Sequence, residues 1–97
     1  MEDIKHKESE SRGMFYIEGE KGIIAELTYQ KQENNIIVID HTKVDRKKEG
    51  QGLATKLVKK TVEFARENKL KIDPLCPFAE VQFERYESYN DVKASRY

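Results

Sequence analysis

The chain has 97 residues and a mass of 11.4 kDa, which suits one domain and is too short for two independent cores. Its 18 lysines and arginines balance its 18 aspartates and glutamates, which excludes the strongly basic composition of a general nucleic-acid or membrane-surface binder. The balanced charge, together with five tyrosines and four phenylalanines, also argues against a disordered chain.

The cysteine content limits the covalent and metal chemistry. Cys76 is the only cysteine in the sequence, so an internal disulfide and a cysteine-only metal cluster are excluded. A lone thiol suits a reducing compartment, and no apolar stretch approaches the roughly 18 residues that span a membrane. We therefore expect a soluble, cytoplasmic domain with no membrane partner.

The first half of the chain predicts a leader and three strands. Residues 1–13 are charged and show no periodicity, so they are predicted to be a flexible leader. Short apolar runs at 14–18, 22–30 and 36–44 are separated by turn-forming residues and predict an antiparallel meander. The third run opens with four consecutive β-branched residues (IIVI), which predict a strand buried on both faces.

The second half predicts helices around one further strand. Residues 51–68 place apolar side chains on one half of the helical circumference and charged ones on the other, as in a helix packed on a sheet. Residues 70–76 resemble a short strand, which should lie parallel to residues 36–44 because a crossover helix precedes it. A weaker helical pattern covers residues 79–89.

These elements predict an α/β fold in the order β-β-β-α-β-α. Its mixed sheet would combine a three-strand antiparallel meander with one parallel strand, and the helices would pack on that sheet. We expect a single domain over residues 14–92, followed by a polar tail at 93–97.

Several catalytic signatures are absent from the sequence. The two histidines, His6 and His41, have no ligand spacing, so no metal site is predicted. The pair Gly50-Gln51-Gly52 fails the dinucleotide fingerprint G-x-G-x-x-G, and neither G-x-x-x-x-G-K nor the elbow G-x-S-x-G occurs.

One strand–loop–helix segment has the composition of an anion site. The predicted strand ends at Val44, a basic loop carries Gly50 and Gly52, and a long helix begins at once. Free backbone N–H groups and the positive end of the helix dipole would then point at one place, which favours a phosphate or pyrophosphate. From spacing alone a second interpretation stays open, in which the glycines only form a turn and the lysines are solvated.

Residues 36–65 also resemble the central motif of the GCN5-related N-acetyltransferase (GNAT) superfamily. That motif reads Gln/Arg-x-x-Gly-x-Gly/Ala, and the match here is Lys47-x-x-Gly50-x-Gly52, with lysine in place of the usual first residue. Further matches resemble the minimal, single-domain YjdJ-type branch of the superfamily: His41-Thr42-x-Val44, Gly50-x-Gly52-Leu53-Ala54, Ala65-Arg66, Cys76-Pro77-Phe78 and Tyr89-x-Asp91.

The resemblance implies a GNAT-like fold and an N-acetyltransferase that uses acetyl coenzyme A as co-substrate. The acceptor would be an amine of a small molecule or of a protein. In the family, loop amides hold the pyrophosphate and the strand before the loop holds the acetyl carbonyl. The coenzyme-binding positions that this implies are Thr42, Val44, Lys47, Lys48, Gly50, Gln51, Gly52 and Leu53.

Two residues are candidates for catalysis. Cys76 would lie where the parallel strand separates from its neighbour, and its thiol could form an acetyl-cysteine; otherwise it is a small buried hydrophobe. His41 is a candidate base near the acetyl site; otherwise it ties down a strand end, and Asp40 and Glu26 are rival bases. Larger relatives place an acid tyrosine near the position of Phe83, which has no proton to donate.

Two other functions remain open. The first is a catalytically weak coenzyme A-binding module that serves as a sensor or partner domain. The second is a small RNA-binding domain that uses residues 43–60, although these lack the interleaved aromatics that base stacking needs, so we expect no nucleic-acid partner. The sequence does not name the acceptor or the oligomeric state.

Overall fold

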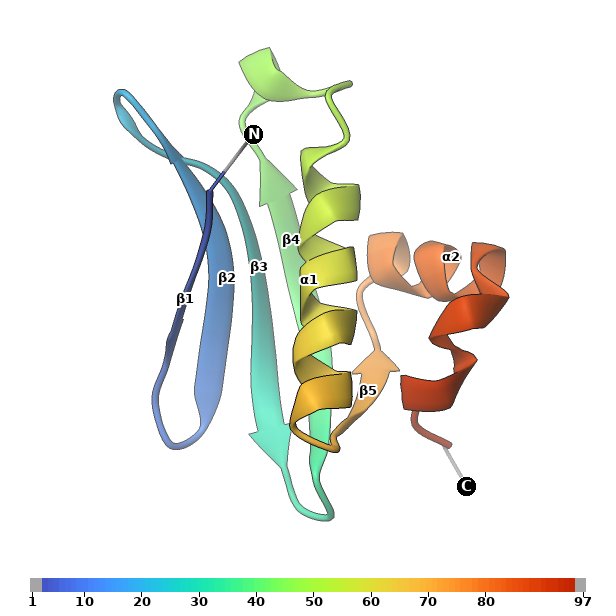
Figure 1. Cartoon of the computed structure of the whole chain (residues 1–97). Coiled ribbons are helices and arrows are strands. Elements are labelled where there is room, and N and C mark those ends of the chain that lie inside the picture. Colours follow the sequence, from blue (N-terminus) through green and yellow to red (C-terminus); the bar gives the residue numbers. More distant parts are fainter. Residues whose placement is uncertain (1–2, 96–97) are drawn as a thin grey trace.

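Five strands form one mixed sheet in the order β1-β2-β3-β4-β5 in the computed structural model, which describes residues 3–95 (Figure 1). The elements are β1 (Ile4–Glu8), β2 (Arg12–Gly19), β3 (Gly22–Gln32), β4 (Ile36–Val44), the 3-10 turn η1 (Arg46–Lys48), α1 (Leu53–Glu67), β5 (Lys71–Pro74), α2 (Pro77–Arg85) and the 3-10 turn η2 (Glu87–Val92). Strands β1 to β4 are antiparallel, and β5 is parallel to β4. The predicted α/β class with one parallel strand is confirmed.

The meander has four strands rather than three, so the prediction of a flexible leader over residues 1–13 is wrong for residues 4–8 and for residues 12–13, which begin β2. Residues 4–8 form β1, which pairs with β2 from Ile4 opposite Ile17 to Glu8 opposite Gly13. His6 lies opposite the buried Phe15 and therefore shares its face of the sheet. Residues 1–2 of the predicted leader lie outside the described residues.

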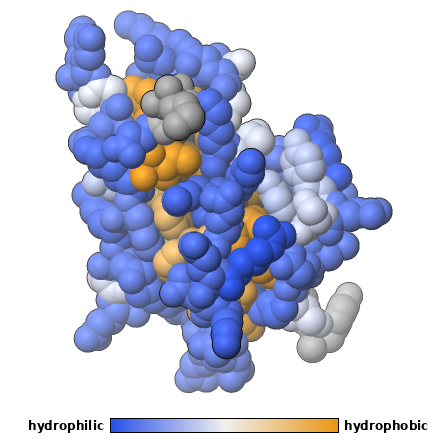
Figure 2. All heavy atoms as spheres, viewed as in Figure 1, coloured by the Kyte–Doolittle hydropathy of each residue, from blue (hydrophilic) through white to orange (hydrophobic). Residues whose placement is uncertain are grey.

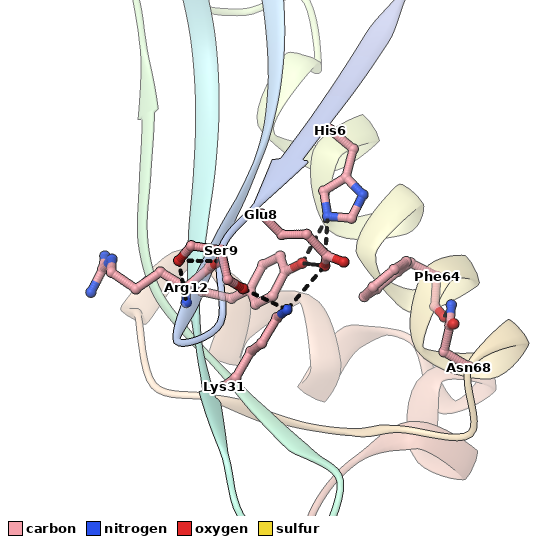
Figure 3. A network of polar contacts seen from close by, with 8 residues as sticks. His6, Glu8, Ser9, Arg12, Lys31, Phe64 and Asn68 are labelled. Carbon is pink, nitrogen blue, oxygen red and sulfur yellow. Dashed lines mark hydrogen bonds and ion pairs between the residues drawn. The ribbon is translucent and has the colours of Figure 1, made fainter.

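Side-chain contacts explain why this charged segment is ordered. The His6 ring stacks on Phe15 with 4.0 Å between ring centroids, and its Nε2 lies 2.7 Å from the Tyr29 hydroxyl. That hydroxyl donates to Glu8 Oε2 at 3.0 Å, and Lys31 Nζ lies 3.4 Å from the same oxygen (Figure 3). Because polar side chains make these contacts, an apolar periodicity is absent from the segment.

The C-terminal end also differs from the prediction. The predicted helix over 79–89 is shifted, since α2 begins at Pro77, whose missing N–H is tolerated in the first turn, and ends at Arg85. The prediction of a tail is wrong for residues 93–94, because the Ala94 N–H donates to the Ile72 carbonyl at 2.7 Å and Ala94 is buried. Residues 96–97 of that tail lie outside the described residues.

The core lies between α1 and one face of the sheet. The largest buried side chains come from both layers: Phe15, Ile17, Leu27, Tyr29, Ile37, Ile39, Leu53, Leu57, Val58 and Val62. Figure 1 shows α1 lying on one face of the sheet and running along its strands, and Figure 2 shows apolar residues on this side of the molecule bordered by hydrophilic ones. The broad apolar face of α1 thus fixes the position of its N-terminus relative to the end of β4.

Candidate active site

Strands β4 and β5 separate halfway along β4. Their pairing ends where Ile39 lies opposite Pro74, and the Ile39 carbonyl accepts from both Leu75 N–H (3.1 Å) and Cys76 N–H (2.9 Å). Beyond that point β4 continues to Val44 and pairs only with β3. The second half of β4 therefore has one edge free of strand pairing, next to the start of α2.

A bulge at the same place sets the direction of the β4 side chains. Ile39 lies opposite Tyr29 and His41 opposite Thr28, so Asp40 is the extra residue. Thr42 then lies opposite the buried Leu27 and shares the face on which α1 packs. His41 and Lys43 lie on the other face.

The loop after β4 brings glycines to the N-terminus of α1. Gly52 precedes the helix with φ +75° and Gly50 has φ +86°, both in the left-handed region that favours glycine. A Cβ built on either glycine would meet no atom within 4 Å. Open space therefore lies beside both, which is what a backbone cradle for an anion requires.

The first turn of α1 provides the hydrogen-bond donors. Gly52 has no side chain to cap the helix, and the first bond into the helix runs from Lys56 N–H to the Gly52 carbonyl at 3.0 Å. The amides of Leu53, Ala54 and Thr55 precede that bond, so they belong to the helix N-terminal donors that a ligand can use.

The amides at the start of the loop are already used. The Lys47 N–H donates to Asp45 Oδ1 at 3.1 Å, the Lys48 N–H to the Asp45 carbonyl at 2.8 Å, and the Glu49 N–H to the Arg46 carbonyl at 3.4 Å. These bonds form η1. The loop amides that remain for an anion are therefore those from Gly50 onward.

A cavity of about 310 Å³ lies along this cradle and the free edge of β4. Its lining includes six of the eight positions that the family resemblance implies: Thr42, Val44, Lys48, Gly50, Gly52 and Leu53. Lys43, Glu49, Ala54, Thr55 and Phe78 complete the lining. Lys47 and Gln51, the other two implied positions, do not line it. The cavity joins the strand end to the helix N-terminus, as an elongated ligand would require.

Cys76 lies at the point where the two strands separate. Its thiol is buried, its Sγ is 3.6 Å from Thr42 Oγ1, and the residue directly precedes α2. The contact with Thr42 brings the cysteine to the β4 edge that the cavity follows. This long-range contact depends on the parallel pairing of β4 and β5, which the sequence alone does not specify in detail.

His41 lies on the opposite face of β4 from Thr42 and is half exposed. Its Nε2 is 3.7 Å from Glu26 Oε2 on the neighbouring strand. The structure thus pairs two of the candidate bases, whereas Cys76 lies on the other side of the strand with Thr42.

Asp40 is poorly suited to act as a base. It accepts from Thr28 Oγ1 at 2.7 Å and Gln30 Nε2 at 2.9 Å, and Arg12 lies 3.3 Å away. Partial burial acts to raise the pKa of Asp40, but these hydrogen bonds and the Arg12 charge outweigh it and hold the pKa below its usual value. A carboxylate whose pKa is held low in this way remains ionised and is a weak base.

The tyrosines that follow Phe83 lie at the far end of α2. Phe83 is buried in the core, with its ring 5.3 Å from that of Tyr89. Burial raises the pKa of Tyr89, and Tyr86 is exposed beyond the last turn of α2. Neither tyrosine lines the cavity. Among residues 3–95, no group of three or more histidine, cysteine or carboxylate side chains could hold a metal ion.

Comparison with solved structures finds one match of high sequence identity and further matches in fold. A GCN5-like candidate N-acetyltransferase from Staphylococcus aureus, solved in solution, is 43% identical over 100% of this chain and 94% of that one, with a TM-score of 0.73. Ribosomal-protein-alanine N-acetyltransferase from Brucella melitensis biovar Abortus is 15% identical, with a TM-score of 0.64 over 92% of this chain and 66% of that one. A candidate streptothricin acetyltransferase from Bacillus anthracis, solved with acetyl coenzyme A, is 20% identical, with a TM-score of 0.59 over 79% and 46%.

The last two likenesses show the fold alone, whereas the first shows the family. No curated protein sequence matches the chain, and within residues 3–95 no helix is long and apolar enough to cross a membrane. The model of the family described as GCN5-related N-acetyl-transferase matches residues 14–92. The chain belongs to the GCN5-related N-acetyltransferase family, and it is an acyltransferase.

Proposed function

We propose that the chain transfers an acetyl group from acetyl coenzyme A to an amine of a small molecule or of a protein. The observation that carries this proposal is the open space beside Gly50 and Gly52 at the uncapped N-terminus of α1. Amide donors and a helix dipole at such a place favour a pyrophosphate. The proposed location is the cytoplasm, which suits the unpaired thiol of Cys76.

The coenzyme would lie in the 310 Å³ cavity with its pyrophosphate on the amides of Gly50 to Thr55. The Lys48 side chain would add a cation, and the free edge of β4 near Thr42 and Val44 would hold the acetyl carbonyl. Lys47 and Gln51 are proposed only for the outer part of the coenzyme, because neither lines the cavity.

The acyl transfer then needs a base for the amine. We propose His41, whose Nε2 lies 3.7 Å from Glu26 Oε2. The amine nitrogen bonds to the acetyl carbon as the bond from carbon to the coenzyme sulfur breaks. The amine proton passes to His41, and a proton returns to the departing thiolate.

Cys76 offers a second route to the same product. Its thiol would first take the acetyl group as the thioester bond to the coenzyme breaks, and the amine would then displace the thiol. Mass spectrometry after mixing with acetyl coenzyme A separates the routes. A single acetyl adduct that Cys76→Ala lacks supports the second route, whereas turnover without an adduct leaves direct attack.

The cradle is tested by the amide NMR signals of residues 50–55 during a coenzyme A titration. In Gly52→Val a branched side chain would occupy the space of the ligand, and we expect at least a hundredfold weaker binding. Gly22→Val is the matched control, because Gly22 also has a positive φ (+123°) and open space but lies at the start of β3, directly after the β2–β3 turn. Equal affinities for the two variants would contradict the cradle.

Turnover distinguishes the enzyme from a coenzyme sensor. An amine panel should yield acetylated product with the wild-type chain, and His41→Gln should lower kcat about a hundredfold or more while coenzyme A affinity stays unchanged. Binding without any product would favour the sensor, and a shift of residues 43–60 by RNA but not by coenzyme A would favour the RNA-binding alternative.

A further inference from the structure

Two polar side chains are buried among the residues that the structure describes, and they differ in their hydrogen bonds. Thr61 on α1 is 0% exposed, and its Oγ1 donates to the Leu57 carbonyl at 2.8 Å. Gln82 on α2 is 4% exposed, and its Oε1 has no hydrogen-bond partner. Burying an acceptor without a donor costs free energy and is rare in folded proteins, so a bound ligand is a candidate donor for Gln82.

The position of Gln82 on α2 connects it to the coenzyme cavity. Helical side chains four residues apart lie on one face and lean toward the N-terminus of the helix, so Gln82 lies next to Phe78 and leans toward it. Phe78 is half-buried and lines the coenzyme cavity. At 1.5 Å per residue, Gln82 is only about 6 Å beyond Phe78 along the helix axis.

The surroundings of α2 leave a ligand as the source of the donor. The helix packs against α1, β4 and β5 (Figure 1), and it begins directly after the point where β4 and β5 separate. Ala79 and Phe83, the other buried residues of α2, are apolar and have no side-chain donor. A ligand that lies along the free edge of β4 and beside α2 can supply an N–H group.

We propose that Gln82 holds the pantetheine arm of the coenzyme, with its Oε1 accepting a hydrogen bond from an amide N–H of that arm. The proposal rests on the acetyltransferase function proposed above. The arm carries amide groups between the pyrophosphate and the sulfur, so it brings donors with it as it passes Phe78. The bond satisfies the buried oxygen only when the coenzyme is bound, and it fixes how far the thioester reaches along β4.

The ligand-free chain tests the cost of the unpaired oxygen. Gln82→Leu replaces the amide by an apolar side chain, so we expect the melting temperature of the free chain to rise by about 4 °C or more. Gln82→Met is a second variant with an unbranched side chain, and it should also raise the melting temperature. Thr61→Val is the matched control and should not, because the buried hydroxyl that it removes already has a partner.

Calorimetric titration tests the role in binding. Coenzyme A should bind Gln82→Leu and Gln82→Met about tenfold more weakly than the wild type, because one amide hydrogen bond is lost. The second ligand is 3′-phosphoadenosine 5′-diphosphate, which is the coenzyme without its pantetheine arm, and it should bind all three chains equally. Thr61→Val should bind coenzyme A as the wild type does. A more stable chain with weaker binding cannot be explained by a damaged fold.

Failure of this inference is separable from failure of the proposed function. Equal coenzyme A affinities of the wild type and Gln82→Leu would overturn the role of Gln82 and leave the coenzyme site standing, as would an equal loss of affinity for the ligand without the arm. Lower melting temperatures of both Gln82 variants would mean that Oε1 has a partner in the free chain and would also overturn it. A wild-type chain that does not bind coenzyme A would remove the proposed function, on which this inference rests.

Discussion

The two ends of α1 use their polar groups in opposite ways. At the N-terminus Gly52 provides no cap, and the amides of the first turn face a cavity. At the C-terminus Arg66 donates twice to Asp91, at 2.8 and 2.9 Å, and the Asn68 side chain donates to the Phe64 carbonyl at 2.9 Å. One end leaves donors to a ligand, and the other uses its side chains to hold the fold.

The aromatic cluster near the C-terminal end follows the same division. Phe64 contacts the rings of His6, Phe15 and Tyr29, with centroids 4.8, 5.4 and 6.0 Å apart. This cluster attaches β1 to the domain. Substitutions here should therefore change stability and leave coenzyme affinity alone, whereas substitutions near Gly52 should do the reverse.

The largest effect on stability is expected from Gly13→Ala. A Cβ at Gly13 would lie 2.1 Å from Cζ of Tyr29, and this fully buried ring has to move. We expect a loss of about 3 kcal/mol in the free energy of unfolding, measured by urea denaturation. Coenzyme A affinity of the folded chain should not change, and a tenfold loss would contradict the separation of the two ends.

Gly22→Ala is the matched control for that variant. A Cβ there meets nothing within 4 Å, so only the positive φ of +123° opposes the substitution. Its cost should stay near 1–2 kcal/mol by the usual penalty for such backbone. An equal cost for the two variants would show that the Tyr29 ring yields more easily than its burial implies.

A smaller effect, on affinity rather than stability, is expected from Asp45→Ala. Asp45 Oδ1 accepts from the Lys47 N–H and holds η1, which sets the path of the chain toward Gly50. Removing this acceptor should reduce the binding free energy of coenzyme A by about 1 kcal/mol, so coenzyme A should bind about fivefold more weakly in a calorimetric titration. Asp45→Asn keeps an acceptor and should bind within twofold of the wild type.

How far the sequence predicts this division depends on which residues make the contacts. Residues 36–44 were predicted as a strand and form β4 with those bounds, because consecutive β-branched residues leave little alternative. The glycine pair and the start of α1 could also be predicted, because a positive φ favours glycine and because helices have a periodic apolar pattern. The family match over residues 14–92 then gave these local signals their chemical meaning.

The parts that were missed depend on distant partners. Strand β1 has His6 and Glu8 at its inward positions, and these are acceptable there only because Tyr29 and Lys31 meet them. The bulge at Asp40 decides that Thr42 faces α1 and that His41 faces away from it, and it depends on the register with β3. Pro77 does carry a local signal. Proline is favoured at the first position of a helix, so it indicates that α2 begins at residue 77.

A shallow pH dependence is expected from His6. Burial lowers the pKa of His6, so below about pH 6.5 the unfolded chain binds a proton that the folded chain does not. Stability should therefore fall as the pH drops from 6.5 toward 5, with a slope below the roughly 1.4 kcal/mol per pH unit of one full proton. Glu8 and Asp40 have lowered pKa values, so the stability that these two carboxylates contribute to the fold is lost only at more acidic pH.

Urea midpoints at pH 7.5, 6.5 and 5.5 measure this slope. The His6→Gln variant should lose stability at pH 7.5, because the stack on Phe15 and the contact with Tyr29 change, but it should show a flatter curve. A slope that persists in His6→Gln would assign the dependence to another group.

The smallest effect is expected from Arg66→Ala at the C-terminal end of α1. Arg66 binds Asp91 and the Ser88 carbonyl, yet its guanidinium is exposed, so water and salt compete with these bonds. The melting temperature should fall by only a few degrees.

The local effect should be larger, because η2 leads directly to Ala94, whose N–H donates to the Ile72 carbonyl at 2.7 Å. Hydrogen exchange at that amide should accelerate in Arg66→Ala, and adding Asp91→Ala should accelerate it little further, since both substitutions remove the same pair. An unchanged exchange rate at Ala94 would mean that its hydrogen bond to the Ile72 carbonyl forms without help from the Arg66–Asp91 pair.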